Sequence, residues 1–446
     1  MKITWMKLTN YRRFAELNTD FDDNVTIFIG KNGEGKSTIL DAIAVMLSSY
    51  TGCFDFGKAH GISLSDARFS RSLDSFGDEQ QFPVSIEMQM DCVGDLVPLK
   101  RELTGPKNKT TIKEIGELIS LGKAQVEKVR AQKQIDLPVI AYYGTGRLWS
   151  VHKEVKRRKT LSASRSMAYE DCLTSASNYK QMQSWVKNAT FAVLQQEQMP
   201  EGQSENIKLQ LQGVAKAVDG MLAGQGWSNF HYSIVHDELS MTHQTQGTLP
   251  VSILSDGVRA MISLVADLAW RAVKLNPHFK EDAPAKSEGI VMIDEVDMHL
   301  HPEWQQVLVG ALRKTFPKIQ FILTTHSPQV LSSVDYNCIR RYVETELPTG
   351  EKFIMGLKPD EQTQGVASSN VMAELQNVDP VPDVEPARWL TEFKGLIAQN
   401  ALETEEAKQL KQKLVNHFGE QHPAWLECER MIRLQAMKAK LPKRNG

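Results

Sequence analysis

The chain has 446 residues, of which 41% are hydrophobic and 24% charged, a balance that predicts a globular protein of two or three domains. Its formal net charge of -2 argues against a protein that coats nucleic acid by bulk charge. No apolar run is long enough for a membrane span, the N-terminus lacks a signal-peptide core, and the five cysteines form no Cys-x-x-Cys pair. We therefore expect a cytoplasmic protein with reduced thiols and no membrane contact.

The beginning of the chain shows α/β patterning. Residues 3–8 predict a strand, and the short apolar run at 25–29, rich in β-branched and aromatic residues, predicts a buried one. Apolar residues then recur at helical spacing over 39–47, so the local order is strand, glycine-rich loop and helix. Residues 82–103 alternate like a β-hairpin, and residues 139–143 predict another buried strand.

Residues from about 151 to 250 have a different character. The apolar positions between Ile207 and Met221 step by four and three, which predicts an amphipathic helix. We expect a helical insertion that is too short for a long coiled-coil arm. It begins with a run of basic residues: Lys153, Lys156, Arg157, Arg158 and Lys159.

Alternating α/β character resumes at about residue 250. We expect a helix over 258–273, a strand over 290–293, a helix near 304–316 and a strand over 319–323. The tail differs again, because a linker with three prolines at 378–386 precedes three helical segments.

Residues 30–37 fit the phosphate-loop pattern G-x-x-x-x-G-K-[ST]. Glycines in such a loop let backbone N–H groups turn inward around phosphate oxygens at a helix N-terminus. Lys36 would reach the β- and γ-phosphates of a nucleotide, and the hydroxyl of Ser37 would bind Mg²⁺. The position of this segment between a strand and a helix argues against a chance glycine turn.

The predicted strand at 290–293 ends in two acids, Asp294 and Glu295. It would deliver both carboxylates to the C-terminal edge of the sheet, where ligands bind in open α/β sheets. Asp294 would hold Mg²⁺, and Glu295 would polarise an attacking water. Apolar runs that end in Asp-Glu are common, so this functional interpretation depends on the phosphate loop.

Two further segments lie at the ends of predicted elements. Residues 254–257 (Leu-Ser-Asp-Gly) precede a helix, where a serine and a glycine amide can form an anion-binding corner or an ordinary N-cap. Residues 324–328 (Thr-Thr-His-Ser-Pro) close the strand after the acidic motif. His326 could therefore lie near a γ-phosphate, although a single histidine is more often structural.

These four motifs, in this order, resemble the ABC-type ATPases of the SMC/RecF branch. The resemblance covers about residues 1–150 and 250–345 and implies a fold class: an α/β, ABC-type (RecF/SMC-like) P-loop ATPase head with a short helical insertion and a C-terminal α-helical domain. It implies that ATP is bound between two subunits. The corresponding domains are an N-terminal ATPase lobe at 1–150, the insertion at 151–250, a C-terminal ATPase lobe at 251–360 and the helical domain at 361–446.

The resemblance also assigns roles to single residues. It makes Ser255 and Gly257 act in trans, on the phosphate that the partner subunit holds. The catalytic residues would be Glu295, His326 and Lys36, and the Mg²⁺ ligands would be Ser37 and Asp294. The ATP-binding residues would be Arg12, Gly30, Asn32, Gly33, Gly35, Lys36, Ser37, Thr38, Ser255 and Gly257. Residues 297–302 match the D-loop, whereas the glutamine of the Q-loop has no assured position; residues 142–149 lie where it is expected.

A narrower resemblance rests on residues 142–149 (Tyr-Tyr-Gly-Thr-Gly-Arg-Leu-Trp), the Leu-His-Pro and Thr-His-Ser-Pro motifs and the helical tail. These features are similar to the ATPase subunits of Septu anti-phage systems, the PtuA family. The resemblance implies a homodimer through the ATP sites or a higher oligomer, and an HNH endonuclease partner of the PtuB type that the ATPase controls. The helices at about 385–440 would dock this partner, or they would pack as a small bundle.

Two other functions are compatible with parts of the pattern. A RecF-like repair ATPase would bind DNA as a clamp, and the basic run at 153–159 could contact phosphates, although such a run is usually a solvated helix face. A self-contained nuclease with a C-terminal Toprim domain, as in OLD-type proteins, would need an Asp-x-Asp pair. The sequence after His326 has none, so we expect no nuclease site in this chain.

Overall fold

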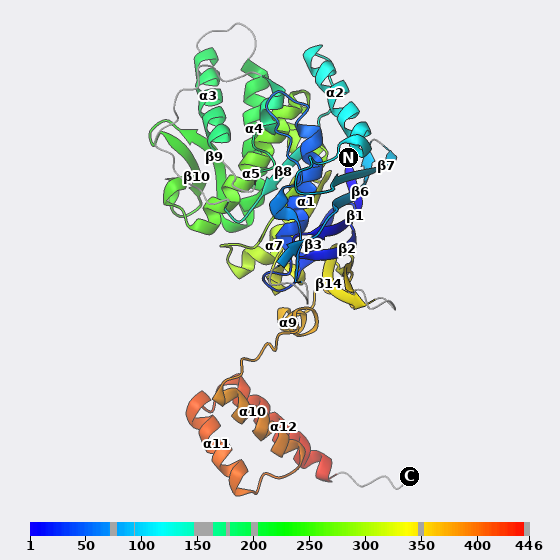
Figure 1. The fold of residues 1–446 in the computed structure, drawn as a ribbon. Coiled ribbons are helices and arrows are strands. Elements are labelled where there is room, and N and C mark those ends of the chain that lie inside the picture. The colour runs from blue at the N-terminus through cyan, green and yellow to red at the C-terminus, as the bar shows by residue number, and fades with distance from the viewer. Residues whose placement is uncertain are drawn as a thin grey trace. The chain divides into compact units, whose positions relative to one another are not determined.

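The computed structural model describes residues 1–71, 78–92, 94–146, 164–174, 179–197, 204–346 and 352–440. The chain divides into two compact units, Met1–Val371 and Met372–Gly446 (Figure 1). The basic run at 153–159 and residues 147–149 lie outside the described residues. Among the helices that the structure describes, none has the length and apolar character needed to cross a membrane.

A ten-stranded mixed sheet forms the centre of the first unit. Across the sheet, the strands follow the order β7 (Asp95–Leu103), β6 (Val84–Cys92), β1 (Lys2–Tyr11), β2 (Phe14–Asp20), β15 (Lys352–Leu357), β14 (Ile339–Glu346), β3 (Val25–Ile29), β13 (Ile319–Thr324), β12 (Gly289–Ile293) and β8 (Val139–Tyr143).

The strands β3, β13, β12 and β8 run parallel to one another. Every residue of these four strands is buried, as expected for parallel strands that are covered on both faces. The predicted strands at 25–29, 139–143, 290–293 and 319–323 are thus confirmed, and β6 and β7 confirm the predicted hairpin. Because the four strands share one direction, the motifs that follow β3, β12 and β13 reach the same edge of the sheet.

Helices cover this parallel part of the sheet. α1 packs on β8 and β13, α5 packs on β8, and Figure 1 shows α3, α4 and α5 side by side. The helices of the first unit are α1 (Lys36–Thr51), α2 (Gly116–Arg130), α3 (Lys180–Glu197), α4 (Ser204–Leu222), α5 (Asp256–Leu275), α6 (Ala283–Lys286), α7 (Pro302–Thr315) and α8 (Pro328–Leu331); α9 (Ser368–Gln376) spans the boundary between the units.

A buried polar network fixes α5 against β8. The hydroxyl of Tyr143, at the end of β8, donates to Oδ2 of Asp267 at 2.7 Å, and Nε of Arg271 donates to the same oxygen at 2.8 Å. The side chains of Asp267 and Arg271 are 2% and 8% exposed, so this ion pair is buried and holds the long helix in one position on the sheet.

The segment that we expected to be a helical insertion is only partly helical. It contains α4, which is the predicted amphipathic helix, and α3, but also a three-stranded antiparallel sheet of β9 (Trp227–Ser233), β10 (Glu238–His243) and β11 (Gly247–Pro250). These strands are four to seven residues long and rich in polar residues, so the alternation of Leu239 and Met241 with polar neighbours in β10 is too brief to predict a strand. Their pairing depends on tertiary contacts, such as Trp227 against His243 with ring centroids 4.7 Å apart. A two-stranded ribbon of β4 (Phe69–Arg71) and β5 (Asp78–Gln80) completes the first unit.

The second unit consists of helices that pack on one another. After the linker, α10 (Glu385–Ala398), α11 (Glu405–Phe418) and α12 (Pro423–Lys440) surround a core of their own, as the bundle interpretation predicts. That core is formed by Phe393, Ile397, Ala407, Leu410, Leu414, Trp425 and Cys428. The rings of Phe393 and Trp425 stack with centroids 5.8 Å apart.

Candidate nucleotide site

The phosphate loop lies between β3 and α1, as predicted. Gly33 and Gly35 have φ angles of 79° and 91°, in the left-handed region that side-chain-bearing residues rarely adopt. Gly35 is the N-cap of α1, and no side chain caps the helix there. The first N–H groups of α1 therefore remain available for an anion at the helix N-terminus.

Lys36 is folded into this loop. Its side chain is nearly buried, with the residue 7% exposed, and Nζ donates to the carbonyl oxygens of Gly30 at 2.9 Å and Lys31 at 3.1 Å. Burial lowers the pKa of Lys36, and the surrounding carboxylates oppose that shift. Four carboxylates act on the ammonium in this way: Glu34, Asp294, Glu295 and Asp297.

Ser37, Asp294 and Thr324 join three elements at one point. The hydroxyl of Ser37 on α1 donates to Oδ2 of Asp294 at 2.7 Å. The hydroxyl of Thr324, at the end of β13, donates to the other oxygen, Oδ1, at 2.6 Å. The carboxylate that follows β12 is therefore held from both sides, by the phosphate-loop helix and by the neighbouring strand.

This arrangement fits Mg²⁺. The hydroxyl of Ser37 and the carboxylate of Asp294 are hard oxygen donors in direct contact, and carboxylates outnumber the lysine around the loop. Within the described ranges, no three His, Cys, Asp or Glu side chains cluster as metal ligands. Mg²⁺ in nucleotide sites usually takes only one or two protein carboxylates and completes its shell with phosphates and water, so the donor set is adequate.

Glu295 has an unusual backbone conformation. Its φ angle is 46°, in the left-handed region, which costs a residue with a side chain on the order of 1–3 kcal/mol. Its N–H donates to the hydroxyl of Thr324 at 2.7 Å, so the strained conformation is fixed from the adjacent strand. Such strain is common at functional sites, where it directs a side chain away from the regular strand.

His326 lies near the phosphate loop, as its electrostatic coupling to Lys36 shows. Burial lowers the pKa of His326, and the charge of Lys36 lowers it further, against the opposing effect of the carboxylates of Glu295, Asp297 and Asp294. A lowered pKa means that the imidazole is neutral at pH 7 and gains a proton only in acid. The hydroxyl of Thr325, next to His326, donates to Asp297.

Ser255 lies at the N-terminus of α5. It is the N-cap of this 20-residue helix and is exposed, yet its side chain makes no capping hydrogen bond in the part of the chain that the structure describes. Asp256 forms an ion pair with Arg259 on the same helix. Within the described residues, no hydrogen bond or ion pair joins the side chain of Ser255 to the phosphate loop or to Asp294 and Glu295.

Gly257 also makes a close backbone approach within its own subunit. A Cβ atom at this position would lie 2.5 Å from the carbonyl oxygen of His299. His299 belongs to the expected D-loop at 297–302 and has a φ angle of 66°. The first turn of α5 and this loop are thus in close backbone contact, and only glycine permits the approach.

Arg12 lies beside α1. Its guanidinium pairs with Asp41, which is one helical turn beyond Ser37, and with Oδ1 of Asp66 at 2.9 Å. Its neighbour Arg13 donates to the carbonyl oxygen of Gly33 in the phosphate loop. Sequence reasoning assigned no role to Arg13, which follows Arg12, or to Thr324, the first residue of the Thr-Thr-His-Ser-Pro motif.

The remaining expected contacts lie in or next to the loop. Asn32 and Gly33 are exposed at its tip, whereas Thr38 is buried in the first turn of α1. In the segment where the Q-loop was expected, Tyr142 lies beside Asp41 of α1. Burial raises the pKa of Tyr142, and the charge of Asp41 adds to the effect, so this tyrosine stays neutral beside α1.

Two family models match the sequence. The first, described as an AAA domain, matches residues 6–218. The second, an AAA domain whose description adds the AbiEii toxin and type IV TA system, matches residues 194–332. Together they span residues 6–332, which contain every site residue placed above.

Two relatives and one solved structure are also similar to this chain. The chain is 28% identical to the "Retron Ec83 probable ATPase" of Escherichia coli over 94% of this chain and 84% of that protein. It is 34% identical to the Septu protein PtuA of Bacillus mycoides (strain KBAB4), over 36% of this chain and 22% of that protein. The SMC head domain from Thermotoga maritima aligns with 80% of this chain and 100% of its own, at a TM-score of 0.42 and 15% identity.

Proposed function

We propose that this chain, which is an ATPase of the SMC/RecF type, binds and hydrolyses ATP with Mg²⁺ between two copies of itself and thereby controls a nuclease on another chain. One contrast supports the proposal. The phosphate loop is hydrogen-bonded to Asp294 through Ser37, whereas Ser255, at the start of α5, is exposed and its side chain does not cap the helix.

In the first half of the site, the chain's own residues bind the phosphates. Lys36 would exchange its bonds to the loop carbonyls of Gly30 and Lys31 for bonds to the β- and γ-phosphates. The backbone from Gly30 to Thr38 and the side chain of Arg12 would complete the contacts to the nucleotide. Mg²⁺, held by Ser37 and Asp294, supplies charge neutralisation at the phosphates.

Glu295 would polarise the attacking water. Its backbone is held in a fixed, left-handed conformation by Thr324, which gives the carboxylate one direction at the edge of the sheet. His326 would contact the γ-phosphate as a neutral imidazole, because its pKa is lowered by burial and by Lys36. A neutral imidazole can donate one hydrogen bond without adding a second positive charge to that of Lys36.

A second copy would supply the other half. Ser255 and the N–H groups at the start of α5 would face the γ-phosphate held by the partner subunit, because a helix N-terminus favours an anion. The D-loop touches the same turn of α5 at Gly257, so closing the dimer would bring both segments to the interface together.

The proposed partner is an HNH endonuclease in an anti-phage defence system. The similarity to a Septu protein and a retron ATPase supports this context. The second unit supports a separate docking module, because it has its own core and leaves large apolar side chains exposed on α12. These side chains are Leu426, Leu434 and Met437.

Co-purification tests the partnership. We expect the full chain to retain an HNH protein encoded beside it, and a truncation from Glu385, which removes α10–α12, to lose it. The remaining ATPase should fold, because the first unit has its own core and the division between the units precedes Glu385. Retention of the nuclease by the truncated chain would move the docking site to the first unit. ATP-independent activity of the nuclease in the intact complex would contradict control by the ATPase.

A further inference from the structure

The beginning of the D-loop is fixed to the segment that follows β13. Asp297, its first residue, accepts a hydrogen bond from the hydroxyl of Thr325, which directly precedes His326. Two residues before the D-loop, the N–H of Glu295 donates to the hydroxyl of Thr324 at 2.7 Å. The D-loop therefore starts in contact with the segment that carries the proposed γ-phosphate contact.

Gln305, in the first turn of α7, connects a later part of the D-loop to the same segment. Its Nε2 donates to the carbonyl oxygen of Leu300, in the D-loop, at 2.8 Å. Its Oε1 accepts from the hydroxyl of Ser327, which directly follows His326, at 2.6 Å. A carbonyl oxygen only accepts hydrogen bonds, so the NH₂ group of Gln305 must face Leu300 and the amide has a single orientation. One half-buried side chain therefore joins the two segments.

Ser327 is itself held in place. It is 5% exposed, and its hydroxyl oxygen caps α8 by accepting from the N–H groups of Gln329 at 3.1 Å and Val330 at 3.2 Å. Its own N–H donates to the hydroxyl of Thr325 at 3.0 Å. The hydroxyl hydrogen has two amide oxygens within reach, and that of Gln305 at 2.6 Å is closer than that of Gln329 at 3.1 Å. The bond to Gln305 thus extends a fixed helix cap.

The D-loop also contacts α5. The carbonyl oxygen of His299 lies 2.5 Å from the position that a Cβ atom of Gly257 would take. His299 stands between Asp297 and Leu300, so the two hydrogen-bonded residues flank the one that touches α5. A displacement of the D-loop would therefore change its contact with the turn of α5 that begins at Ser255.

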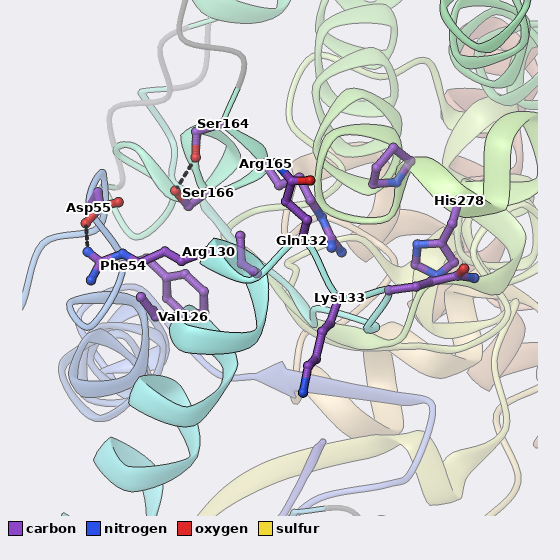
Figure 2. A pocket seen from close by; sticks show the side chains of 13 residues that line it. Phe54, Asp55, Val126, Arg130, Gln132, Lys133, Ser164, Arg165, Ser166 and His278 are labelled. Carbon is purple, nitrogen blue, oxygen red and sulfur yellow. Dashed lines mark hydrogen bonds and ion pairs between the residues drawn. The ribbon is translucent and has the colours of Figure 1, made fainter.

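The cavity shown in Figure 2 is formed by other parts of the first unit. Its volume is about 550 Å³, and its lining includes Phe54, Arg130 and His278. Among the described residues, this lining contains none from the D-loop, from α7 or from residues 324–328. The hydrogen bonds of Gln305, and not a ligand in that cavity, therefore connect the D-loop to the segment of His326.

We propose that Gln305 is a positioning residue of the ATP site. It keeps the D-loop and the segment of His326 in one arrangement, so that the contact of His326 with the γ-phosphate also sets the loop that a second copy meets. Gln305 acts through Leu300 and Ser327 and touches neither the nucleotide nor Mg²⁺. This inference rests on the proposed function, because it assumes hydrolysis between two copies of the chain.

Gln305→Leu tests the proposal, since leucine is of similar size and makes no hydrogen bond. We expect the turnover rate of ATP hydrolysis to fall by about tenfold or more, because a D-loop that is no longer held misplaces the reacting groups. The affinity for a fluorescent ATP analogue should stay that of the wild type, since Lys36 and Ser37 keep their contacts. Thermal unfolding without nucleotide verifies that the variant folds.

Gln305→Glu separates the two contacts. A carboxylate still accepts from Ser327 but cannot donate to the carbonyl oxygen of Leu300, so this variant should lose turnover as Gln305→Leu does. The matched control is Gln306→Leu, which makes the same change at the next position of α7, where the side chain is exposed, and it should hydrolyse ATP like the wild type.

Three results would overturn the proposal: wild-type turnover in Gln305→Leu, wild-type turnover in Gln305→Glu, or an equal loss of ATP affinity and turnover, which would indicate a general structural role. A fall in turnover as large in Gln306→Leu would also contradict it. Failure of the unmodified chain to bind or hydrolyse ATP is a different result, because it would contradict the proposed function itself.

Discussion

The two halves of the proposed ATP site differ in how far one chain completes them. In the phosphate-loop half, Ser37 and Thr324 both bond to Asp294, and Lys36 is bonded within the loop. In the other half, Ser255 begins α5 as an exposed N-cap whose side chain caps nothing among the described residues. The side chains of the first half are therefore hydrogen-bonded to one another without a ligand. The second half presents helix N–H groups that can donate hydrogen bonds to an external anion.

This difference suggests how ATP could act as a switch. In the proposed dimer, the phosphate-loop half of one subunit would bind the nucleotide, and the γ-phosphate would be the anion that satisfies the α5 corner of the other subunit. The dimer would form with ATP and weaken after hydrolysis, since the differential contact is made to the γ-phosphate.

Replacement of Lys36 should have the largest effect. In Lys36→Ala, the loop loses the buried ammonium, and we expect ATP affinity to fall by more than about a hundredfold, because hydrogen bonds from a charged group to phosphate are strong. Binding of a fluorescent ATP analogue measures this loss. Lys31→Ala, at an exposed position of the same loop, is the control and should bind normally. Wild-type affinity in Lys36→Ala would count against the phosphate-loop assignment.

Glu295→Gln tests catalysis separately from binding. The variant keeps the size of the side chain but cannot accept a proton, so we expect hydrolysis to fall by about 10²–10⁴-fold while ATP still binds. Size-exclusion chromatography with ATP should show a trapped dimer. The exposed residue Glu303 on α7 provides the control, as Glu303→Gln should hydrolyse ATP like the wild type. Unchanged hydrolysis in Glu295→Gln would exclude Glu295 as the base.

Gly257→Ala tests the contact between α5 and the D-loop. The added Cβ would lie 2.5 Å from the carbonyl oxygen of His299, so the D-loop must shift. We expect hydrolysis to fall by about tenfold with ATP affinity retained, since overpacking of this kind costs about 1–3 kcal/mol. Gly310→Ala on α7, where an added Cβ meets nothing within 4 Å, is the matched control. Equal rates for the two variants would show that the contact does not matter for hydrolysis.

The smallest expected effect is that of Tyr143→Phe. This change removes the hydrogen bond from β8 to Asp267 on α5 but leaves the pair of Asp267 with Arg271. We expect the free energy of unfolding to fall by about 1–3 kcal/mol, the cost of one buried hydrogen bond to a charged group. Urea denaturation measures this change, and Tyr336→Phe at a partly exposed position should be neutral. A neutral Tyr143→Phe would mean that packing alone fixes α5 on β8.

Two kinds of element could be predicted from the sequence: strands that are buried on both faces, and helices that bury one stripe of side chains. The parallel strands and α1, α4, α5 and α7 have the expected places, because burial imposes a pattern on every turn or strand position. The strands β9–β11 could not be predicted, since short, partly polar strands depend on their pairing rather than on local propensity.

The site shows a similar limit. The spacing of the phosphate-loop pattern identifies Lys36 and Ser37, and the end of an apolar strand identifies Asp294. The contacts between motifs are tertiary. The hydroxyl of Thr324 on β13 donates to Asp294 at the end of the neighbouring β12, and Gly257 on α5 lies against the carbonyl oxygen of His299. Sequence spacing carries no information on such contacts, so these roles emerged only from the structure.

The most direct test of a site shared between two copies mixes two inactive variants. Lys36→Ala would disable the phosphate loop, and Ser255→Arg would disable the α5 corner, so each variant alone should hydrolyse no ATP. In a mixed dimer, the intact loop of one subunit faces the intact corner of the other. An equal mixture should therefore recover about a quarter of wild-type activity, because half of the dimers are mixed and each has one intact site of two. A mixture that stays as inactive as its components, or a fully active Ser255→Arg variant, would contradict a shared site.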